Sequence, residues 1–280
     1  MLIAGFLVLP AFAADKMTAQ QVIERIQAST GGDWKGPTVD TFKAGDPNTP
    51  VTGIATTFTP TMSVLKRAAT SGKNLIITHE PTFYNHLDQT ALVQNDPVYL
   101  DKQRFIAQHH MVIWRFHDHW HQAPLLKHDG ILQGMTAELG WQRYQSRDDA
   151  HKFDLPETNL KALAADLRRR LHSNIIRVVG SPDMKVTGVY FLPGASGEVK
   201  QIHGLEKPGV QVLVAGEASE WETVEYTRDA SEQGRQKALI LLGHAVSEET
   251  GMSECAEWLK TILPGVAVEF IPAGEPFWMP

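Results

Sequence analysis

Histidine and carboxylate side chains directly follow short apolar runs at three places in the chain. These places are residues 76–80 (Ile-Ile-Thr-His-Glu), 116–121 (Phe-His-Asp-His-Trp-His) and 242–248 (Leu-Gly-His-Ala-Val-Ser-Glu). A strand that ends at such a point would hold the side chains in place before an ion binds. Imidazole and carboxylate together suit zinc, iron or manganese. The pattern therefore predicts a site for divalent metal ions where three distant segments converge.

The spacing within two of these segments indicates which side chains point together. His244 and Glu248 are four residues apart where an apolar run turns into a helical pattern, so one helical turn would bring both to the same face. His117, His119 and His121 alternate, and an extended backbone would send all three to one side. On that reading His119 is a substitute metal ligand.

Most of the chain alternates helical periodicity with short β-branched apolar runs, which is typical of an α/β protein with buried sheets. We expect six strands and five helices from these patterns. The expected strands are residues 51–55, 74–78, 111–116, 186–191, 211–215 and 238–242. The expected helices are residues 19–28, 62–69, 160–171, 222–233 and 252–263.

An internal echo predicts two similar α/β lobes that arose by duplication. Residues 51–54 (Val-Thr-Gly-Ile) recur as 186–189 (Val-Thr-Gly-Val), and about twenty residues after each come a glycine, an apolar run and a Glu, at Glu80 and Glu217. We expect a first lobe from residues 17–124 plus 235–280 and a second from 125–234. Ligands collect at the carboxyl ends of strands in α/β sheets, so the metal site is expected in the cleft between the lobes.

Composition narrows the classes of partner. The 280 residues are 42% hydrophobic and 21% charged with a formal net charge of −6, which is the profile of a globular protein. Lys and Arg form no concentrated patch, so nucleic acid is not an expected partner. The single cysteine, Cys255, lies at helical spacing among apolar residues and is interpreted as a core residue.

The N-terminus resembles an export signal. An apolar run over residues 2–13 ends in Ala-Phe-Ala and is followed by polar residues, although the usual basic start is missing. The sequence predicts a signal peptide over residues 1–13 and a periplasmic or secreted protein, or a cytoplasmic one if this run is not cleaved. No later apolar stretch is long enough for a membrane span, so no membrane contact is expected of the mature chain.

The same residues resemble the Nif-three-like dinuclear metal centre hexameric family, also labelled GTP cyclohydrolase type-two-like. Residues 74–81 are similar to its "NLIITHHP" stretch, and 51–54 match its first strand. Residues 215–217 (Ala-Gly-Glu) stand at its "TGE", and 243–248 at its "GHxxxE". Four motifs keep their order and spacing from about residue 18 to 271.

By position, the resemblance implies five metal ligands: His79, Glu80, His121, His244 and Glu248. Glu80 stands where the family has a second His, and His121 stands where the family has an Asp, so three imidazoles and two carboxylates remain. A carboxylate can bridge two metals whereas an imidazole nitrogen cannot. If the family's Asp bridges, Glu80 or Glu248 would have to bridge here, or only one ion would be held firmly.

The resemblance also implies a function and an assembly. It predicts two divalent ions per subunit, a hexameric ring, and a hydrolase of a small, nucleotide-like substrate in which a metal-activated hydroxide attacks. His117 matches a further family His and is a candidate to orient a ligand or contact substrate, with plain surface exposure as the alternative. Glu217 is a candidate acid or base, with capping or a salt bridge as the alternative.

Two other readings stay open. The same ligands could serve a non-catalytic metal carrier or regulatory protein, and no glycine-rich phosphate loop supports GTP as the substrate. The pair His117 and His119 after a strand also resembles the HxH of metal-dependent amidohydrolases. The chain is short for the barrel which that reading needs.

Overall fold

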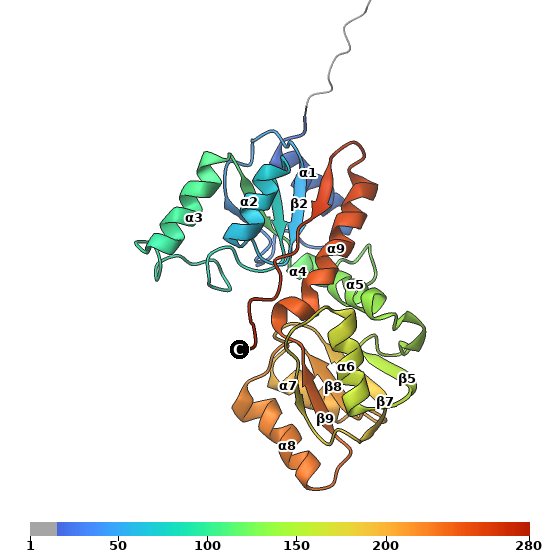
Figure 1. Cartoon of the computed structure of the whole chain (residues 1–280). Helices are drawn as coiled ribbons and strands as arrows, with labels where there is room; N and C mark the ends of the chain where they lie inside the picture. Colours follow the sequence, from blue (N-terminus) through green and yellow to red (C-terminus); the bar gives the residue numbers. More distant parts are fainter. Residues whose placement is uncertain (1–15) are drawn as a thin grey trace, which may run out of the picture.

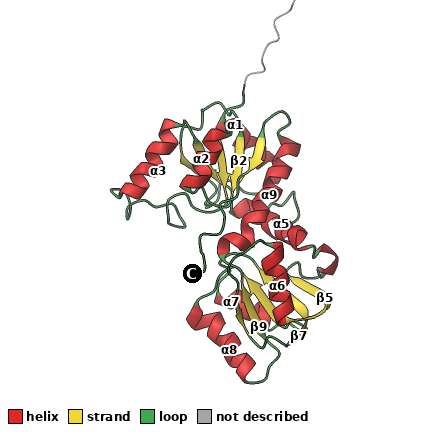
Figure 2. Cartoon of the chain, in the orientation of Figure 1, coloured by secondary structure: helices red, strands yellow, loops and turns green. Residues whose placement is uncertain are grey.

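The computed structural model describes residues 16–280, so the predicted signal peptide at residues 1–13 lies outside the described residues. Over the described range the chain forms two five-stranded sheets covered by helices (Figures 1 and 2). The predicted α/β class is confirmed. We call the sheet β1-β4-β3-β2-β10 with its helices the first lobe, and the sheet β5-β7-β8-β9-β6 with its helices the second lobe.

The elements follow one another along the chain in a mixed order. The strands are β1 (Phe42–Ala44), β2 (Ile54–Thr57), β3 (Leu75–Thr78), β4 (Val112–Arg115), β5 (Lys152–Asn159), β6 (Arg177–Val179), β7 (Lys185–Leu192), β8 (Val212–Ala215), β9 (Ala238–Leu241) and β10 (Val268–Phe270). The helices are α1 (Ala19–Thr30), α2 (Met62–Thr70), α3 (Pro97–Gln108), α4 (Asp118–His121), α5 (Gly130–Leu139), α6 (Leu160–Arg170), α7 (Glu198–Leu205), α8 (Glu225–Glu232) and α9 (His244–Ile262), with a 3-10 turn at Gln142–Tyr144 and a π-helical turn at Glu220–Val224.

Each sheet has parallel strands at its centre. In the first lobe β10, β2, β3 and β4 are parallel and β1 is antiparallel to β4. In the second lobe β7, β8 and β9 are parallel, with β5 and β6 antiparallel at the edges. Helices cover both faces of each sheet, so most central strands are buried on both sides and read as continuous apolar runs.

All six predicted strands form, but one lies in a different lobe from the one expected. The predicted first lobe included residues 235–280, whereas β9 pairs with β8 in register from Val212–Ala238 to Ala215–Leu241. The chain returns to the first lobe only along α9, which leads from β9 to β10. The division at residue 235 is therefore wrong for this strand, because β9 completes the parallel centre of the second sheet.

The sequence echo has a structural counterpart. The side-chain amide oxygen of Asn74 accepts a hydrogen bond from the Thr52 amide at 2.7 Å, and that of Gln211 accepts one from the Thr187 amide at 2.8 Å. Each contact ties the start of one central strand to the next. This match supports a repeated strand-helix-strand unit, while the common origin of the two lobes remains a prediction.

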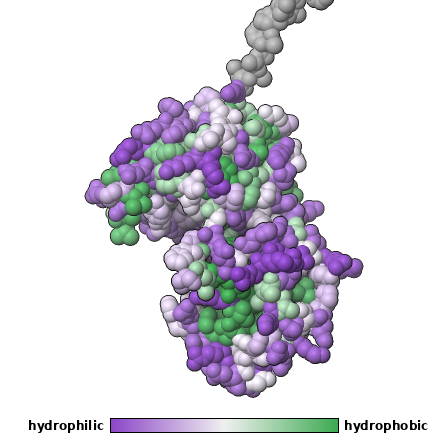
Figure 3. Space-filling model, in the orientation of Figure 1, coloured by the Kyte–Doolittle hydropathy of each residue, from purple (hydrophilic) through white to green (hydrophobic). Residues whose placement is uncertain are grey.

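The surface is largely hydrophilic, and hydrophobic residues emerge in separate patches on the two lobes in the view of Figure 3. Leu92 in the first lobe is 95% exposed and Trp221 in the second is 79% exposed. None of the helices within residues 16–280 combines the length and the apolarity that a bilayer crossing requires.

Helices α5 and α9 cross at two glycines and join the lobes. A Cβ at Gly134 would come within 2.7 Å of the Gly251 Cα, and one at Gly251 would come within 2.5 Å of the Ile131 Cα. Only glycine permits this approach. Since α9 carries two of the candidate ligands, the crossing also fixes their position.

We expect Gly134→Val to lower the free energy of unfolding by about 1–3 kcal/mol, because the added side chain forces the two helices apart. Urea denaturation would measure the change. Ala137→Val places the same side chain on the exposed face of α5 and should cost less than the Gly134 change. Equal stabilities for the two variants would contradict the tight crossing.

Candidate metal centre

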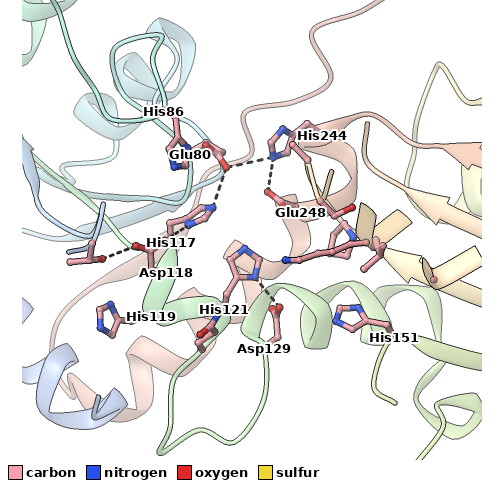
Figure 4. A pocket seen from close by; sticks show the side chains of 18 of the residues that line it. Glu80, His86, His117, Asp118, His119, His121, Asp129, His151, His244 and Glu248 are labelled. Atoms are coloured by element: carbon pink, nitrogen blue, oxygen red, sulfur yellow. Dashed lines mark hydrogen bonds and ion pairs between the residues drawn. The ribbon is translucent and has the colours of Figure 1, made fainter. Parts of the chain in front are cut away.

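The candidate ligands, apart from the fully buried His79, line one cavity between the two lobes. The cavity has a volume of about 1110 Å³, and its walls include ends of β3 and β4, the helix α4, the start of α9 and the loop after β7 (Figure 4). The predicted convergence of three distant segments is present in the fold. Of the predicted residues, Glu80, His117, His121, His244 and Glu248 line the cavity.

His79 follows β3 and is completely buried. Its Nδ1 donates to the carbonyl oxygen of Phe116 at 3.2 Å, which leaves Nε2 as an electron-pair donor. Nε2 lies 3.4 Å from Oε2 of Glu248. Both atoms are buried and neither has a hydrogen-bond partner among the described residues.

Glu80 is held by a buried arginine. Arg115 on β4 donates from Nη2 to Oε2 of Glu80 at 3.0 Å and from Nε to the carbonyl oxygen of His79 at 2.9 Å. Burial alone would raise the pKa of Glu80, but the hydrogen bond with His244 and the charges around it hold the pKa below its usual value. The carboxylate is therefore ionised and available as a ligand.

A single buried carboxylate organises the histidine-rich segment after β4. Asp40 accepts hydrogen bonds from the backbone amides of His117, at 2.6 Å, Asp118 and His119, so it caps the short helix α4. Because the segment is helical, His117 and His121 lie four residues apart on one side.

The predicted alternation of His117, His119 and His121 is therefore wrong. His119 turns away, with its Nδ1 2.8 Å from Asp40 and its ring stacked on Trp34 at 3.5 Å between centroids. His119 does not lie with His117 and His121. The amidohydrolase interpretation needs both His117 and His119 as ligands, so it loses one of them.

His117 faces the other candidate ligands more closely than the resemblance implied. Its Nδ1 is 2.8 Å from Asp118, and its Nε2 is 3.6 Å from Oε1 of Glu80. Burial is the main cause that lowers the pKa of His117, to about 4, so the ring is neutral. The ligand atoms of His79, His117 and His121 all lie within 4.8 Å of one another.

His121 is oriented by a residue that the sequence reasoning missed. Asp129 caps α5 through Oδ1, which accepts from the Leu132 amide at 2.9 Å, and its Oδ2 lies 2.8 Å from His121 Nδ1. Burial alone would lower the pKa of His121, but this hydrogen bond and charge raise it. The position of Asp129 just before a helical pattern was the only signal in the sequence, and it indicates a cap rather than a contact to His121.

His244 and Glu248 open α9, as their spacing predicted. His244 Nε2 lies 3.1 Å from Glu248 Oε2 and 3.5 Å from Glu80 Oε1. Its Nδ1 lies 3.4 Å from Glu217 Oε1. Burial lowers the pKa of His244, but the ion pairs with Glu217, Glu248 and Glu80 outweigh it and raise the pKa to about 12. Three carboxylates thus surround one imidazole.

The arrangement fits a metal ion. A second group of donors, His79, Glu80 and Glu248, also lies within 4.8 Å, and it shares His79 with the all-histidine group. Buried polar atoms are normally hydrogen-bonded, so the unpartnered His79 Nε2 and Glu248 Oε2 at 3.4 Å call for a cation. This His/Glu cluster could bind a metal ion with the donor types that zinc, iron and manganese accept.

Solved structures share the fold at low sequence identity. The Staphylococcus aureus hypothetical protein SA1388 matches with a TM-score of 0.73 at 18% identity, covering 95% of this chain and 100% of that one. A Bacillus cereus protein related to NIF3 matches with a TM-score of 0.73 at 16% identity, again covering 95% and 100%. Reduced HcgD from Methanocaldococcus jannaschii matches with a TM-score of 0.62 at 16% identity, covering 92% and 98%.

Sequence comparison gives the family directly. No curated protein matches the chain. The profile of the Duf34/NIF3 (NGG1p interacting factor 3) family matches residues 23–276, which is nearly the whole chain and includes every candidate ligand. The resemblance inferred from the strand-end motifs is confirmed, and the chain belongs to the Duf34/NIF3 family.

Proposed function

We propose that the cluster holds two divalent ions, zinc, iron or manganese, and serves the hydrolysis of a small, nucleotide-like substrate. The observation that carries the proposal is the pair of buried, unpartnered atoms, His79 Nε2 and Glu248 Oε2, that face each other at 3.4 Å. Glu248 Oε2 also lies 3.1 Å from His244 Nε2, but His79 Nε2 faces no other polar partner among residues 16–280. Without a cation the desolvation of His79 Nε2 is therefore uncompensated, at a cost of roughly 1–3 kcal/mol.

The donors form two groups that share His79, and its single free nitrogen, Nε2, can bind only one ion. His79, His117 and His121 would hold one ion, and Glu80, Glu248 and His244 would hold the other. Because Glu80 and Glu248 each contact His244 as well, either carboxylate could bridge, which removes the need for a bridging residue at His121. His117 then adds a ligand to the five that the resemblance implied.

Bound divalent ions would polarise the substrate and lower the pKa of water. The chain's own residues would handle protons. Glu217 is about half exposed at the end of β8, and its hydrogen bond with His244 holds its pKa below the usual value. It is therefore ionised, and we assign it the role of proton acceptor beside His244.

Assembly and export belong to the same proposal. We propose a homohexamer on the strength of the family resemblance. Export to the periplasm rests on the N-terminal sequence pattern alone.

Elemental analysis of the purified protein should find about two divalent ions per chain. His121→Ala and Glu80→Ala should each lose at least one of them, because each removes a donor from a different position. His119→Ala is the matched control, since that ring lies against Asp40, and it should keep both ions. Equal metal content in all three variants would contradict the ligand assignment.

Asp129→Asn should weaken metal binding roughly 10–100-fold by releasing the ring of His121, as loss of an outer hydrogen bond to a ligand histidine typically does. The asparagine oxygen can still cap α5, so the free energy of unfolding of the metal-free protein should change little. A competition titration with a zinc chelator measures the affinity. Unchanged affinity would show that Asp129 does not position His121.

Hydrolysis can be tested with a panel of nucleotides and phosphate esters on the metal-loaded protein. Glu217→Gln should lower kcat by roughly 10²–10⁴ while metal content stays the same, as expected for loss of a general base. If the wild-type protein keeps its metal but turns over no member of the panel, the hydrolase proposal fails and the alternative function as a metal carrier is favoured.

A further inference from the structure

The cavity wall opposite the candidate metal centre is basic. Among its described lining residues, every carboxylate comes from the first lobe, from α9, or from the segment that ends at Asp129. The lining residues between 151 and 207 include no carboxylate. They contribute instead His151, Lys200, His203 and Lys207. The charges that line the cavity are therefore divided between its two sides.

Helix α7 arranges this basic wall. Lys200, His203 and Lys207 are spaced by three and four residues, so they share one side of the helix and its C-terminal turn. Gly204 lies between them, and a Cβ there would come within 2.4 Å of the Tyr190 ring. The glycine lets α7 pack directly on β7, so the sheet rather than a loop determines the position of the basic wall.

A short loop fixes the basic wall relative to the candidate ligands. Gly194 has φ +65°, and a Cβ there would come within 2.0 Å of Oε1 of Glu248. Its amide donates to Oγ of Ser247 at 2.9 Å. The chain runs from this contact to α7 within four residues. The loop before α7 therefore packs directly against Glu248, which fixes the basic wall relative to that carboxylate.

Two of the basic side chains are free to bind a ligand. Lys207 pairs with Asp149 and lies 5.0 Å from the Tyr190 ring centroid, so its charge is already engaged. Lys200 and His203 are exposed, and neither makes an ion pair within residues 16–280.

We infer that Lys200 and His203 form an anion subsite that binds a phosphate group of the substrate, away from the bond that is cleaved. The inference rests on the proposed function, because it supposes that the reacting bond lies at the metal centre. A lysine acts on phosphate as a point charge, and an imidazole adds a directed donor. The substrate is then an organic phosphate that spans the cavity from the centre to α7.

The subsite can be measured without metal. Inorganic phosphate is titrated into the metal-free protein at low ionic strength, with phosphorus NMR or calorimetry as the readout. The double variant Lys200→Ala/His203→Ala should bind phosphate at least tenfold more weakly than wild type. The control Lys161→Ala/His109→Ala removes the same side-chain types from an exposed position of α6 and from the exposed residue after α3, both outside the cavity, and should bind as wild type does.

A second experiment uses the metal-loaded protein. An alkane bisphosphonate should bind at least tenfold more tightly than the alkylphosphonate of equal length, and the double variant should lose this advantage while keeping its metal content. Equal phosphate binding by wild type and double variant in the metal-free arm would overturn the subsite. Absence of bound metal in wild type would overturn the proposed function instead, and the metal-free arm would still decide the subsite.

Discussion

The arrangement depends on the burial of a histidine nitrogen against a carboxylate oxygen with nothing between them. His79 Nε2 and Glu248 Oε2 are inaccessible to solvent, come from different parts of the fold, and lack hydrogen bonds within the described residues. A fold keeps such atoms only where something compensates for lost water. A divalent cation compensates both at once. The positions of the remaining candidate ligands follow from this requirement.

The scaffold holds these ligands through contacts that are themselves rigid. Arg115 fixes Glu80 from β4, Asp40 caps α4 and so aims His117 and His121, and Asp129 holds the ring of His121. The glycine crossing of α5 and α9 keeps the lobes together at the point where α9 delivers His244 and Glu248. Since each ligand is fixed before an ion binds, little conformational entropy remains to be lost on binding.

The sequence predicted the parts that depend on local pattern. The central strands are apolar runs buried on both faces, and the candidate ligands follow directly after them. The strands and the ligands could therefore both be predicted from the sequence. Edge strands such as β1 and β6 are short and partly exposed, and they carry no such signal. The orientation of His119 could not be foreseen, because Asp40, more than seventy residues away, makes its segment helical. Arg115 was missed because its partner Glu80 follows a neighbouring strand, and Asp129 because its contact to His121 depends on the path of the loop between them. Strand β9 was placed in the wrong lobe because pairing partners are not local.

The most direct test of the central claim is anomalous diffraction from crystals of the zinc-loaded protein, recorded on both sides of the zinc absorption edge. The account predicts anomalous peaks within about 2.0–2.2 Å of His79 Nε2 and of a Glu248 oxygen, the usual zinc–ligand distances. An ordered structure at full zinc occupancy elsewhere, with no peak between these two residues, would contradict it.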